Sequence, residues 1–255
     1  MNGLIALLRK QGFSGELDDS LETRDYFSHD ASMFELRPQL VASPKSVRDV
    51  ERLVQFVAAH KKTDPGLSLT ARSAGTDMAG GAINESIIVN FAAHFTRVKY
   101  QDDMTAVTEP GVFYRDFERE TLRHGLLMPS YPASRELCQM GGLVANNSGG
   151  EKSLEYGKVE KFVKQLKAVL ADGNEYTIKP LSKLELDKIM RQSDFEGKLY
   201  KRIYQICEDH YDLIKSAKPA VSKNSMGYGI WNVWDRETGV FDMTQLIIGS
   251  EGTLG

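Results

Sequence analysis

One stretch near the start of the chain carries apolar residues at the spacing of an α-helix. Its apolar positions are Val47, Val50, Leu53, Val54 and Val57. Intervals of three and four residues place these side chains on one face, so the pattern predicts an amphipathic helix over residues 47–60. Ser46 can cap the first turn of this helix, and Asp64-Pro65-Gly66 interrupts the pattern beyond it.

Short runs of β-forming residues alternate with helical patterns through the first half of the chain. The expected strands cover residues 40–42, 67–69, 87–89, 98–100 and 105–108. A second helix is predicted over residues 113–124, and Gly125 stands where a C-terminal cap belongs. Phe113, Phe117 and Leu122 are expected to face the core from this helix. The alternation indicates an α+β or α/β domain.

The two ends of the chain give weaker patterns. Residues 1–34 are expected to be helical and polar, with Leu17, Leu21 and Tyr26 on one face. Further on, residues 162–170 and 176–178 predict a hairpin around the Asp172-Gly173-Asn174 turn. Charged helices on the surface are expected over residues 181–192 and 198–214, and residues 222–234 stay ambiguous.

Composition and charge narrow the class of protein. The 255 residues suffice for one large or two small domains, and the apolar fraction of 41% is that of a globular protein. A net charge of −3 argues against a nucleic-acid or membrane-surface role based on basic patches. No segment has the length of a membrane span or the layout of a secretory signal, so we expect a cytoplasmic protein with reduced Cys138 and Cys207.

A loop of small residues lies between two expected strands, at Leu69 to Gly81 (LTARSAGTDMAGG). Small side chains leave successive main-chain N–H groups uncovered, and such a nest binds phosphate. Gly75, Gly80 and Gly81 supply the conformational freedom that a tight turn requires. A purely structural turn is the competing interpretation.

Two later segments share this character. Residues 128–150 (MPSYPASRELCQMGGLVANNSGG) are too long for an ordinary connection and too apolar for disorder, so we expect them to be functional. Residues 249–255 form a third Gly-rich loop. Together the three loops suit an extended ligand with a phosphate part and a flat polar ring, such as a flavin dinucleotide. The alternative is that each loop is only a turn.

These segments resemble the vanillyl-alcohol oxidase superfamily, the PCMH-type FAD-binding domain, and especially its FAD-linked dehydrogenases of D-lactate, glycolate and D-2-hydroxyglutarate. The resemblance covers roughly residues 36–255. It rests on Arg72–Gly81 (RSAGTDMAGG), Glu109–Val112 (EPGV), Pro129–Ser134 (PSYPAS), Gly141–Gly150 (GGLVANNSGG), Tyr156-Gly157 and Gly249–Gly255 (GSEGTLG). It implies an α+β fold of two lobes with FAD between them.

The same resemblance implies an organisation and a set of cofactor contacts. After the expected helical lead-in at residues 1–34, it implies a first lobe at 35–128 with the pyrophosphate loop, and a second lobe at 129–255 with the ring-side and ADP-side loops. The implied FAD-binding residues are Arg72, Ser73, Ala74, Gly75, Thr76, Asp77, Met78, Gly80, Gly81, Pro129, Pro132, Ser134, Gly141, Gly142, Val144, Asn146, Gly149, Glu251, Gly252 and Thr253.

Some relatives attach FAD covalently through a histidine in the first loop. Thr76 stands at the corresponding position here and has no nucleophilic nitrogen, so the resemblance implies noncovalent FAD. Cys138 is a second conceivable attachment point. Arg72 could neutralise phosphate or pair with a carboxylate. The Lys223–Tyr228 stretch (KNSMGY) could face the flavin, although Tyr228, Trp231 and Trp234 are better explained as core or cap-facing aromatics.

The family implies oxidation of a small 2-hydroxy acid by hydride transfer to flavin N5, with a quinone, an iron–sulfur protein or another carrier as electron acceptor. A cap domain usually supplies the substrate site and the catalytic base. We therefore expect the chain to be part of a longer protein, and we assign no catalytic residue and no metal ligand. The alternatives are an FAD-binding module without turnover and a reductase acting on an enolpyruvyl sugar nucleotide. Attachment at the inner face of a membrane also stays open.

Overall fold

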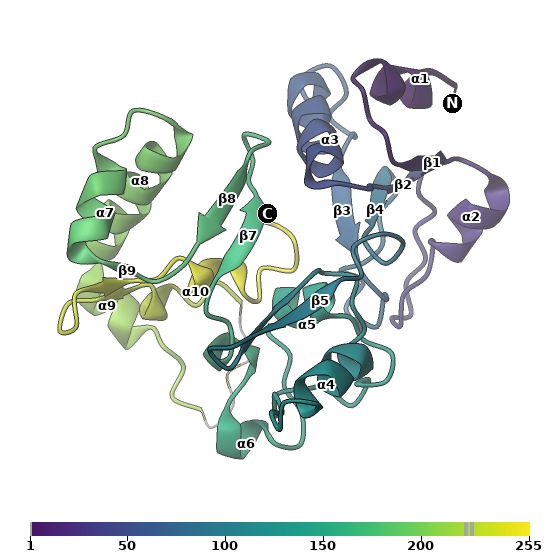
Figure 1. The fold of residues 1–255 in the computed structure, drawn as a ribbon. Helices are drawn as coiled ribbons and strands as arrows, with labels where there is room; N and C mark the ends of the chain where they lie inside the picture. Colours follow the sequence, from purple (N-terminus) through teal and green to yellow (C-terminus); the bar gives the residue numbers. More distant parts are fainter. Residues whose placement is uncertain (1, 222–223, 225–226) are drawn as a thin grey trace.

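The computed structural model describes residues 2–221, 224 and 227–255, and Figure 1 shows its fold. Buried apolar side chains form three clusters among these residues. The first cluster draws its members from Leu8 to Val89, the second from Val112 to Val159, and the third from Leu170 to Met243. Three parts of the chain, drawn in purple to blue, teal, and green to yellow, therefore each have a core of their own (Figure 1).

A four-stranded sheet forms the first part, in the order β1-β2-β4-β3. Its strands are β1 (Glu16–Asp18), β2 (Leu40–Ser43), β3 (Leu69–Arg72) and β4 (Ile87–Asn90). Strands β2, β4 and β3 are parallel, whereas β1 pairs antiparallel with β2 at one edge. Because parallel strands end at the same edge of a sheet, the segments that follow Ser43, Arg72 and Asn90 leave it side by side.

Helix α3 (Val47–His60) covers one face of this sheet, and α1 (Asn2–Lys10) contacts α3. Leu53 and Phe56 of α3 are fully buried in the first core, next to apolar side chains of β2 and β4. The hydroxyl of Ser46 accepts a hydrogen bond from the Asp49 N–H and caps the helix. Helix α2 (Leu21–Tyr26) contacts β2.

The middle part combines a hairpin with short helices. Its elements are β5 (Val98–Gln101), β6 (Thr105–Thr108), α4 (Tyr114–Leu122), α5 (Met140–Ala145), α6 (Ser153–Tyr156) and a 3-10 turn at Val159–Lys161. Strands β5 and β6 pair antiparallel, and α4 contacts β5. Tyr114 of α4 and Leu143 of α5 are fully buried in the second core.

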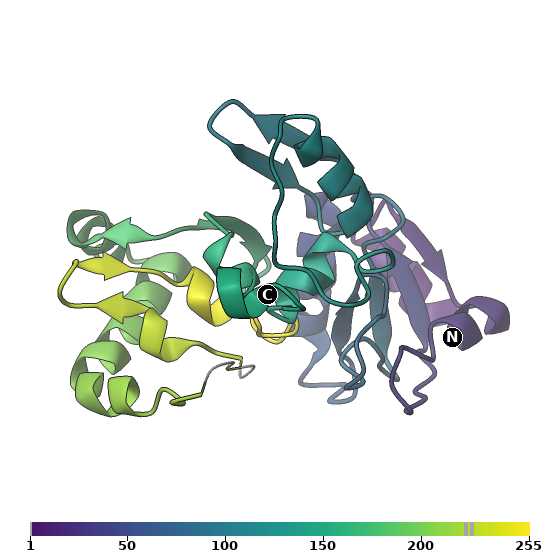
Figure 2. The same cartoon turned by 90° about the horizontal axis from the view of Figure 1, so that it is seen from below.

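The last part packs helices against two small sheets, as Figure 2 shows from another side. Its strands are β7 (Leu166–Val169), β8 (Glu175–Ile178), β9 (Leu181–Ser182), β10 (Trp234–Asp235) and β11 (Val240–Phe241). Its helices are α7 (Lys183–Met190), α8 (Phe195–Asp209), α9 (Tyr211–Ser216) and α10 (Thr244–Ile247), with a 3-10 turn at Ile230–Asn232. Leu186, Tyr200 and Phe241 are among the buried members of its core.

The β7–β8 hairpin of the last part contacts helix α3 of the first. The Gln55 side chain donates a hydrogen bond to the main-chain oxygen of Gly173 at 3.0 Å. Gly173 has a φ of +77°, and a Cβ there would lie 2.3 Å from Cγ of Gln55. The turn therefore needs glycine both for its backbone conformation and for its contact with α3.

Several sequence predictions are confirmed. Helix α3 spans residues 47–60 as expected, and strands occur over four of the five predicted runs of the first half. The run expected at residues 67–69 is displaced, because strand β3 begins at Leu69 and continues to Arg72. Gly125 has a φ of +71° after helix α4, which agrees with the predicted cap. The hairpin around Asp172-Gly173-Asn174 forms, although its first strand begins at Leu166 and not at residue 162.

Other predictions were wrong. Residues 1–34 contain strand β1, and Leu21 and Tyr26 are exposed, so no continuous amphipathic helix forms there. Leu122 is also exposed, and Tyr114 takes the buried position in α4 instead. Helices α7 and α8 are not merely surface elements, because Leu186, Tyr200 and Cys207 bury their side chains in the third core.

The second core contains residues from both sides of the predicted boundary between the two lobes, which lies between residues 128 and 129. It unites Tyr114 and Phe117 on one side of that position with Tyr131 and Leu143 on the other. The two-lobe boundary stays a prediction. In the part of the chain that the structure describes, we find no helix with the length and apolar character required to cross a membrane.

Candidate functional site

The segment that follows strand β3 presents a row of uncommitted main-chain donors. Across the described residues, the N–H groups of Ala74 through Gly80 donate to no acceptor, whereas the N–H of Gly81 donates to Asp77 Oδ2 at 2.9 Å. Gly75 and Gly80 have φ values of +68° and +83°, which only glycine adopts readily. Successive free N–H groups in a folded loop form a concave site for an anion.

The buried side chain of Arg72 supports this loop. Its guanidinium is buried and donates to the main-chain oxygens of Phe27 at 3.4 Å and Ala82 at 3.2 Å, and it lies 5.2 Å from the centre of the Phe27 ring. Burial lowers the pKa of Arg72, and the negative charge of Asp30 partly opposes this shift. A Cβ on Gly75 would lie 2.6 Å from Nη2 of Arg72. The arginine therefore links the residue after the loop, Ala82, to the end of helix α2 at Phe27 through their carbonyl groups.

Helix α5 contacts the start of the same loop. The N–H of Gly142 donates to Ser73 Oγ at 3.1 Å, and the N–H of Gly141 donates to the Pro110 oxygen at 2.8 Å. A Cβ on Gly141 would lie 2.5 Å from Cβ of Pro110. The Gly-Gly pair thus allows the helix to approach the loop and the Pro110 turn closely.

The last loop, residues 249–255, contacts both helix α5 and the loop that follows β3. The N–H groups of Gly249 and Glu251 donate to the oxygens of Val144 at 3.1 Å and Ala145 at 2.9 Å. The Glu251 carboxylate accepts a hydrogen bond from the Asn146 side chain at 3.2 Å. A Cβ placed on Gly81 would lie 3.3 Å from Glu251 Oε2, and one placed on Gly252 would lie 3.6 Å from Cβ of Ala71.

Three segments that are far apart in the sequence therefore meet at one place. These are residues 73–81, helix α5 with Asn146, and residues 249–252. Figure 2 shows the last loop, in yellow, beside the teal helices of the middle part. This convergence is what the interpretation of the loops as one binding site requires, because loops on separate surfaces could not hold a single ligand.

Other predicted site residues lie against a different neighbour. The stretch that contains Pro129, Pro132 and Ser134 packs on residues 148–150: Ser130 Oγ donates to the Ser148 oxygen at 3.2 Å. A Cβ on Gly150 would lie 2.0 Å from the Tyr131 oxygen, and one on Gly149 would lie 2.6 Å from Ser153 Oγ. These contacts show that the stretch supports the region after α5, and its role as a ring-side surface stays a prediction.

Covalent attachment through Cys138 does not fit its surroundings. The side chain is buried in the second core, and burial raises the pKa of the thiol to about 11. The thiolate is the nucleophilic form, so this cysteine is inert at neutral pH. No group of three or more histidine, cysteine or acidic side chains that could hold a metal ion occurs among the described residues.

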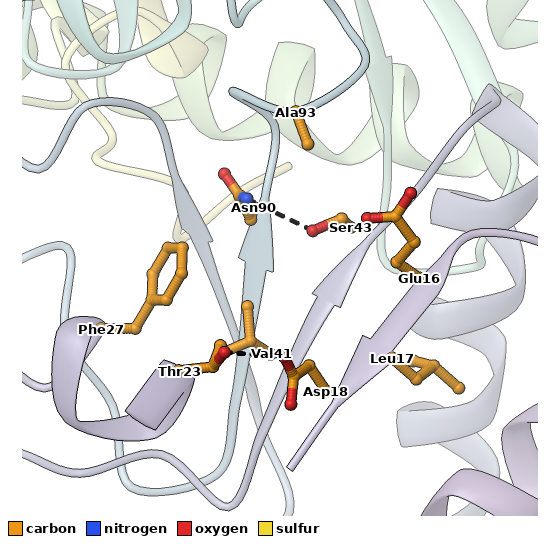
Figure 3. Close-up of a pocket in the computed structure, with 9 residues that line it drawn as sticks. All are labelled: Glu16, Leu17, Asp18, Thr23, Phe27, Val41, Ser43, Asn90 and Ala93. Carbon is orange, nitrogen blue, oxygen red and sulfur yellow. Dashed lines mark hydrogen bonds between the residues drawn. The ribbon is translucent and has the colours of Figure 1, made fainter. Parts of the chain in front are cut away.

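A separate pocket of about 420 Å³ opens on the face of the first sheet that lies away from α3 (Figure 3). Its lining includes Val41, Phe27 and Asn90 together with two carboxylates, Glu16 and Asp18. A hydrogen bond from Lys45 lowers the pKa of Glu16, and hydrogen bonds from Thr23 and Ser20 lower that of Asp18. Both groups are therefore ionised at neutral pH. This pocket suits neither a phosphate nor a hydroxy acid, in contrast to the amide-lined loop.

Sequence reasoning missed some structural features of the site. The oxygen of Pro110 accepts the N–H of Gly141, and nothing in the local pattern of residues 109–112 predicts that contact. Of the KNSMGY stretch, Lys223, Ser225 and Met226 lie outside the described residues. Tyr228 is half exposed, whereas Trp231 and Trp234 are buried, so the packing interpretation is confirmed for the two tryptophans.

Comparisons with known proteins agree with this geometry. Residues 38–179 match the model of a family described as FAD binding domain. The chain is 30% identical over 250 residues to D-2-hydroxyglutarate dehydrogenase of Escherichia coli (strain K12), covering 97% of this chain and 24% of that protein. It is 27% identical to glycolate oxidase subunit GlcD of Bacillus subtilis (strain 168), covering 93% and 39% respectively. It thus spans about a quarter of the D-2-hydroxyglutarate dehydrogenase.

Solved structures show the same fold. An alkyldihydroxyacetonephosphate synthase superposes with a TM-score of 0.59 at 20% identity, covering 70% of this chain and 35% of that one. The expected mixed α+β architecture is confirmed, and the loop that follows β3 has the free N–H groups that a dinucleotide phosphate requires. The chain belongs to the PCMH-type FAD-binding domain family of FAD-linked oxidoreductases, and FAD is the cofactor of that family.

Proposed function

We propose that this chain is the cofactor-binding part of an FAD-dependent oxidoreductase that oxidises a small 2-hydroxy acid. The observation that carries the proposal is the convergence of residues 73–81, helix α5 and the last loop around free N–H groups. The substrate class is supported by the names of the relatives, which refer to D-2-hydroxyglutarate and glycolate. When bound, FAD supplies N5 as the acceptor of a hydride.

Different residues of this chain would contact different parts of the cofactor. The N–H groups of Ala74 through Gly80 would bind the pyrophosphate, because they are free and follow one another along a folded loop. Gly142 and Gly252 leave room for the remainder of the dinucleotide, since neither has a neighbour closer to its missing Cβ than 3.5 Å. The Glu251 carboxylate cannot favour a phosphate and is suited to accept hydrogen bonds from hydroxyl groups. Binding is noncovalent.

The test is made on the purified chain. We expect a yellow protein, or a colourless one that takes up added FAD with saturation. Under anaerobic conditions, D-2-hydroxyglutarate, D-lactate or glycolate should bleach the visible absorbance of the bound flavin, because the flavin accepts the hydride of the substrate. L-lactate serves as the stereochemical control. A chain that takes up no FAD would refute the proposal.

A second candidate is a module that binds FAD without turnover of its own. It is favoured by one observation, namely that the chain spans only 24% of the E. coli relative. In that case dithionite would reduce the bound flavin, whereas none of the hydroxy acids would. The electron acceptor, whether a quinone, an iron–sulfur protein or another carrier, would be identified by offering each one to the reduced flavin.

A further inference from the structure

The last loop adopts a backbone that needs support from outside. Gly249 and Gly252 have φ values of +82° and +75°, and Glu251 between them has a φ of +53°. A residue with a side chain rarely adopts this left-handed region, because its Cβ is crowded against the backbone there. Such a conformation persists only where neighbouring groups fix it.

One of those neighbours is Tyr228. Its phenol oxygen lies 2.5 Å from the hydroxyl oxygen of Thr253. The Thr253 hydroxyl in turn donates to the Ser250 oxygen at 2.6 Å. A threonine hydroxyl has a single proton, and that proton is already used. Tyr228 is therefore the donor, and the hydrogen bonds run in one direction from Tyr228 through Thr253 to Ser250.

Tyr228 is itself held in a left-handed backbone, with a φ of +52°. Gly227 before it packs tightly on the last loop, since a Cβ there would lie 2.2 Å from the Gly249 oxygen. Gly229 after it donates its N–H to the Gln245 oxygen at 3.1 Å. Two residues with side chains in this uncommon conformation, Tyr228 and Glu251, thus belong to one network.

The network ends at the cofactor site. Glu251 is hydrogen-bonded to Ala145 and Asn146 of the α5 end and lies next to Gly81 of the first loop. A shift of the last loop would change the separation of Glu251 and Gly252 from residues 73–81. Through its hydrogen bond to Thr253, the Tyr228 hydroxyl therefore helps to set the separation between the last loop and residues 73–81. Tyr228 itself belongs to the third part of the chain.

We propose that Tyr228 is a positioning residue for FAD, which fixes the last loop by donating a hydrogen bond to Thr253. This inference rests on the proposed FAD binding. It assigns the tyrosine no contact with the reacting atoms.

The test compares Tyr228→Phe, Thr253→Val and the double variant with the wild-type chain. Loss of one hydrogen bond of about 1 kcal/mol should weaken FAD binding roughly five- to tenfold in each single variant, measured by quenching of flavin fluorescence. The double variant should be no weaker than either single variant, because both remove the same contact. Thr253→Ser keeps the hydroxyl and should restore wild-type affinity.

Tyr204→Phe is the matched control, because it also removes a phenol hydrogen bond, to Glu208 at 3.3 Å, but in the third core. It should change thermal stability without changing FAD affinity. The visible circular dichroism of bound flavin gives a second readout, which should change in Tyr228→Phe and not in Tyr204→Phe.

If Tyr228→Phe does not fold, Thr253→Val measures the same hydrogen bond from its other side. Wild-type affinity in both single variants, or additive losses in the double variant, would overturn the inference while FAD binding itself stands. A wild-type chain that binds no FAD would instead refute the proposed function, and the positioning role with it.

Discussion

The hydroxyl oxygen of Ser73 accepts a hydrogen bond from the N–H of Gly142 at 3.1 Å, although the two residues are 69 positions apart. Ser73 follows strand β3, and Gly142 lies in the first turn of α5. The first turn of a helix has N–H groups without intrahelical partners. Ser73 supplies an acceptor for one of them and so joins the first loop to the middle part of the chain.

Replacing Ser73 with alanine should weaken this junction. The Gly142 N–H would lose its acceptor, at a cost of about 1 kcal/mol, so FAD affinity should fall by about five- to tenfold. Titration of the apo chain with FAD measures the effect. Ser68→Ala removes a comparable hydroxyl, which accepts from the Asn84 side chain at 3.0 Å. That control should lose stability and keep its FAD affinity; equal affinity in both variants would contradict the prediction.

The two neighbouring glycines of α5 should respond differently to alanine. A Cβ on Gly141 would lie 2.5 Å from the Pro110 ring, so the helix or the turn must move, and we expect a loss of about 1–3 kcal/mol. A Cβ on Gly142 would meet Cβ of Ser73 at an ordinary 3.5 Å. Gly142→Ala should therefore be neutral or up to about 1 kcal/mol more stable, because alanine favours helix. Chemical unfolding of both variants measures the contrast, which similar losses would disprove.

The cofactor should be released when the chain is denatured. Thr76 offers no nucleophilic nitrogen, and burial raises the pKa of Cys138 to about 11, which leaves almost no thiolate at neutral pH. Acid precipitation should therefore leave flavin absorbance in the supernatant and none on the polypeptide. In the folded chain, Cys138 should also resist alkylation by iodoacetamide at pH 7. Flavin fluorescence that stays with the denatured chain on a gel would show that this expectation is wrong.

Asp49 should make the chain sensitive to acid. Burial alone raises the pKa of its carboxyl, but hydrogen bonds from the N–H groups of Ser14 and Lys45 and from the Ser14 hydroxyl outweigh this and lower it. The native pKa is thus below the unfolded value of about 3.9, so the contribution is present above about pH 4 and is lost as the pH falls through the native pKa.

Asp49→Asn tests this relationship. At pH 7 the variant should be less stable by about 1–3 kcal/mol, because hydrogen bonds to a charged acceptor are replaced by weaker ones. The difference from the wild-type chain should shrink as the pH is lowered below about 4. Urea unfolding at a series of pH values measures both quantities. Asp64→Asn is a matched control, since Asp64 lies in an exposed turn. A difference that stays constant with pH would contradict the assignment.

The sequence predicted helices and strands best where several local signals, such as apolar spacing and a capping residue, agree. Helix α3 combines an apolar stripe with the Ser46 cap, and its bounds match the structure. Strand β1 was missed because it has three residues, two of them charged and exposed, and exists only through its pairing with β2. Helix α5 was missed because a Gly-Gly sequence has low helix propensity, and burial of Met140 and Leu143 decides its conformation instead.

The candidate site was predictable in part. The composition of residues 73–81 indicated free N–H donors, since small residues cover little of the backbone. It could not indicate that Ser73 meets Gly142, or that Glu251 meets Asn146, because such contacts depend on how the three parts pack. The role of Arg72 was likewise undetermined, since its hydrogen bonds to the main-chain oxygens of Phe27 and Ala82 depend on the folding of residues that are not its neighbours in the sequence.

The donors of residues 74–80 belong to the peptide backbone, which every sequence possesses. Proline alone among the twenty residues deletes such a donor, because its nitrogen carries no hydrogen. Every other substitution can only obstruct the donors with bulk or bend them out of line, so natural variation along this loop should be limited by volume and by the exclusion of proline more than by side-chain chemistry. A designer who wishes to abolish the site without unfolding the chain has to add bulk or introduce proline here instead of removing a reactive side chain.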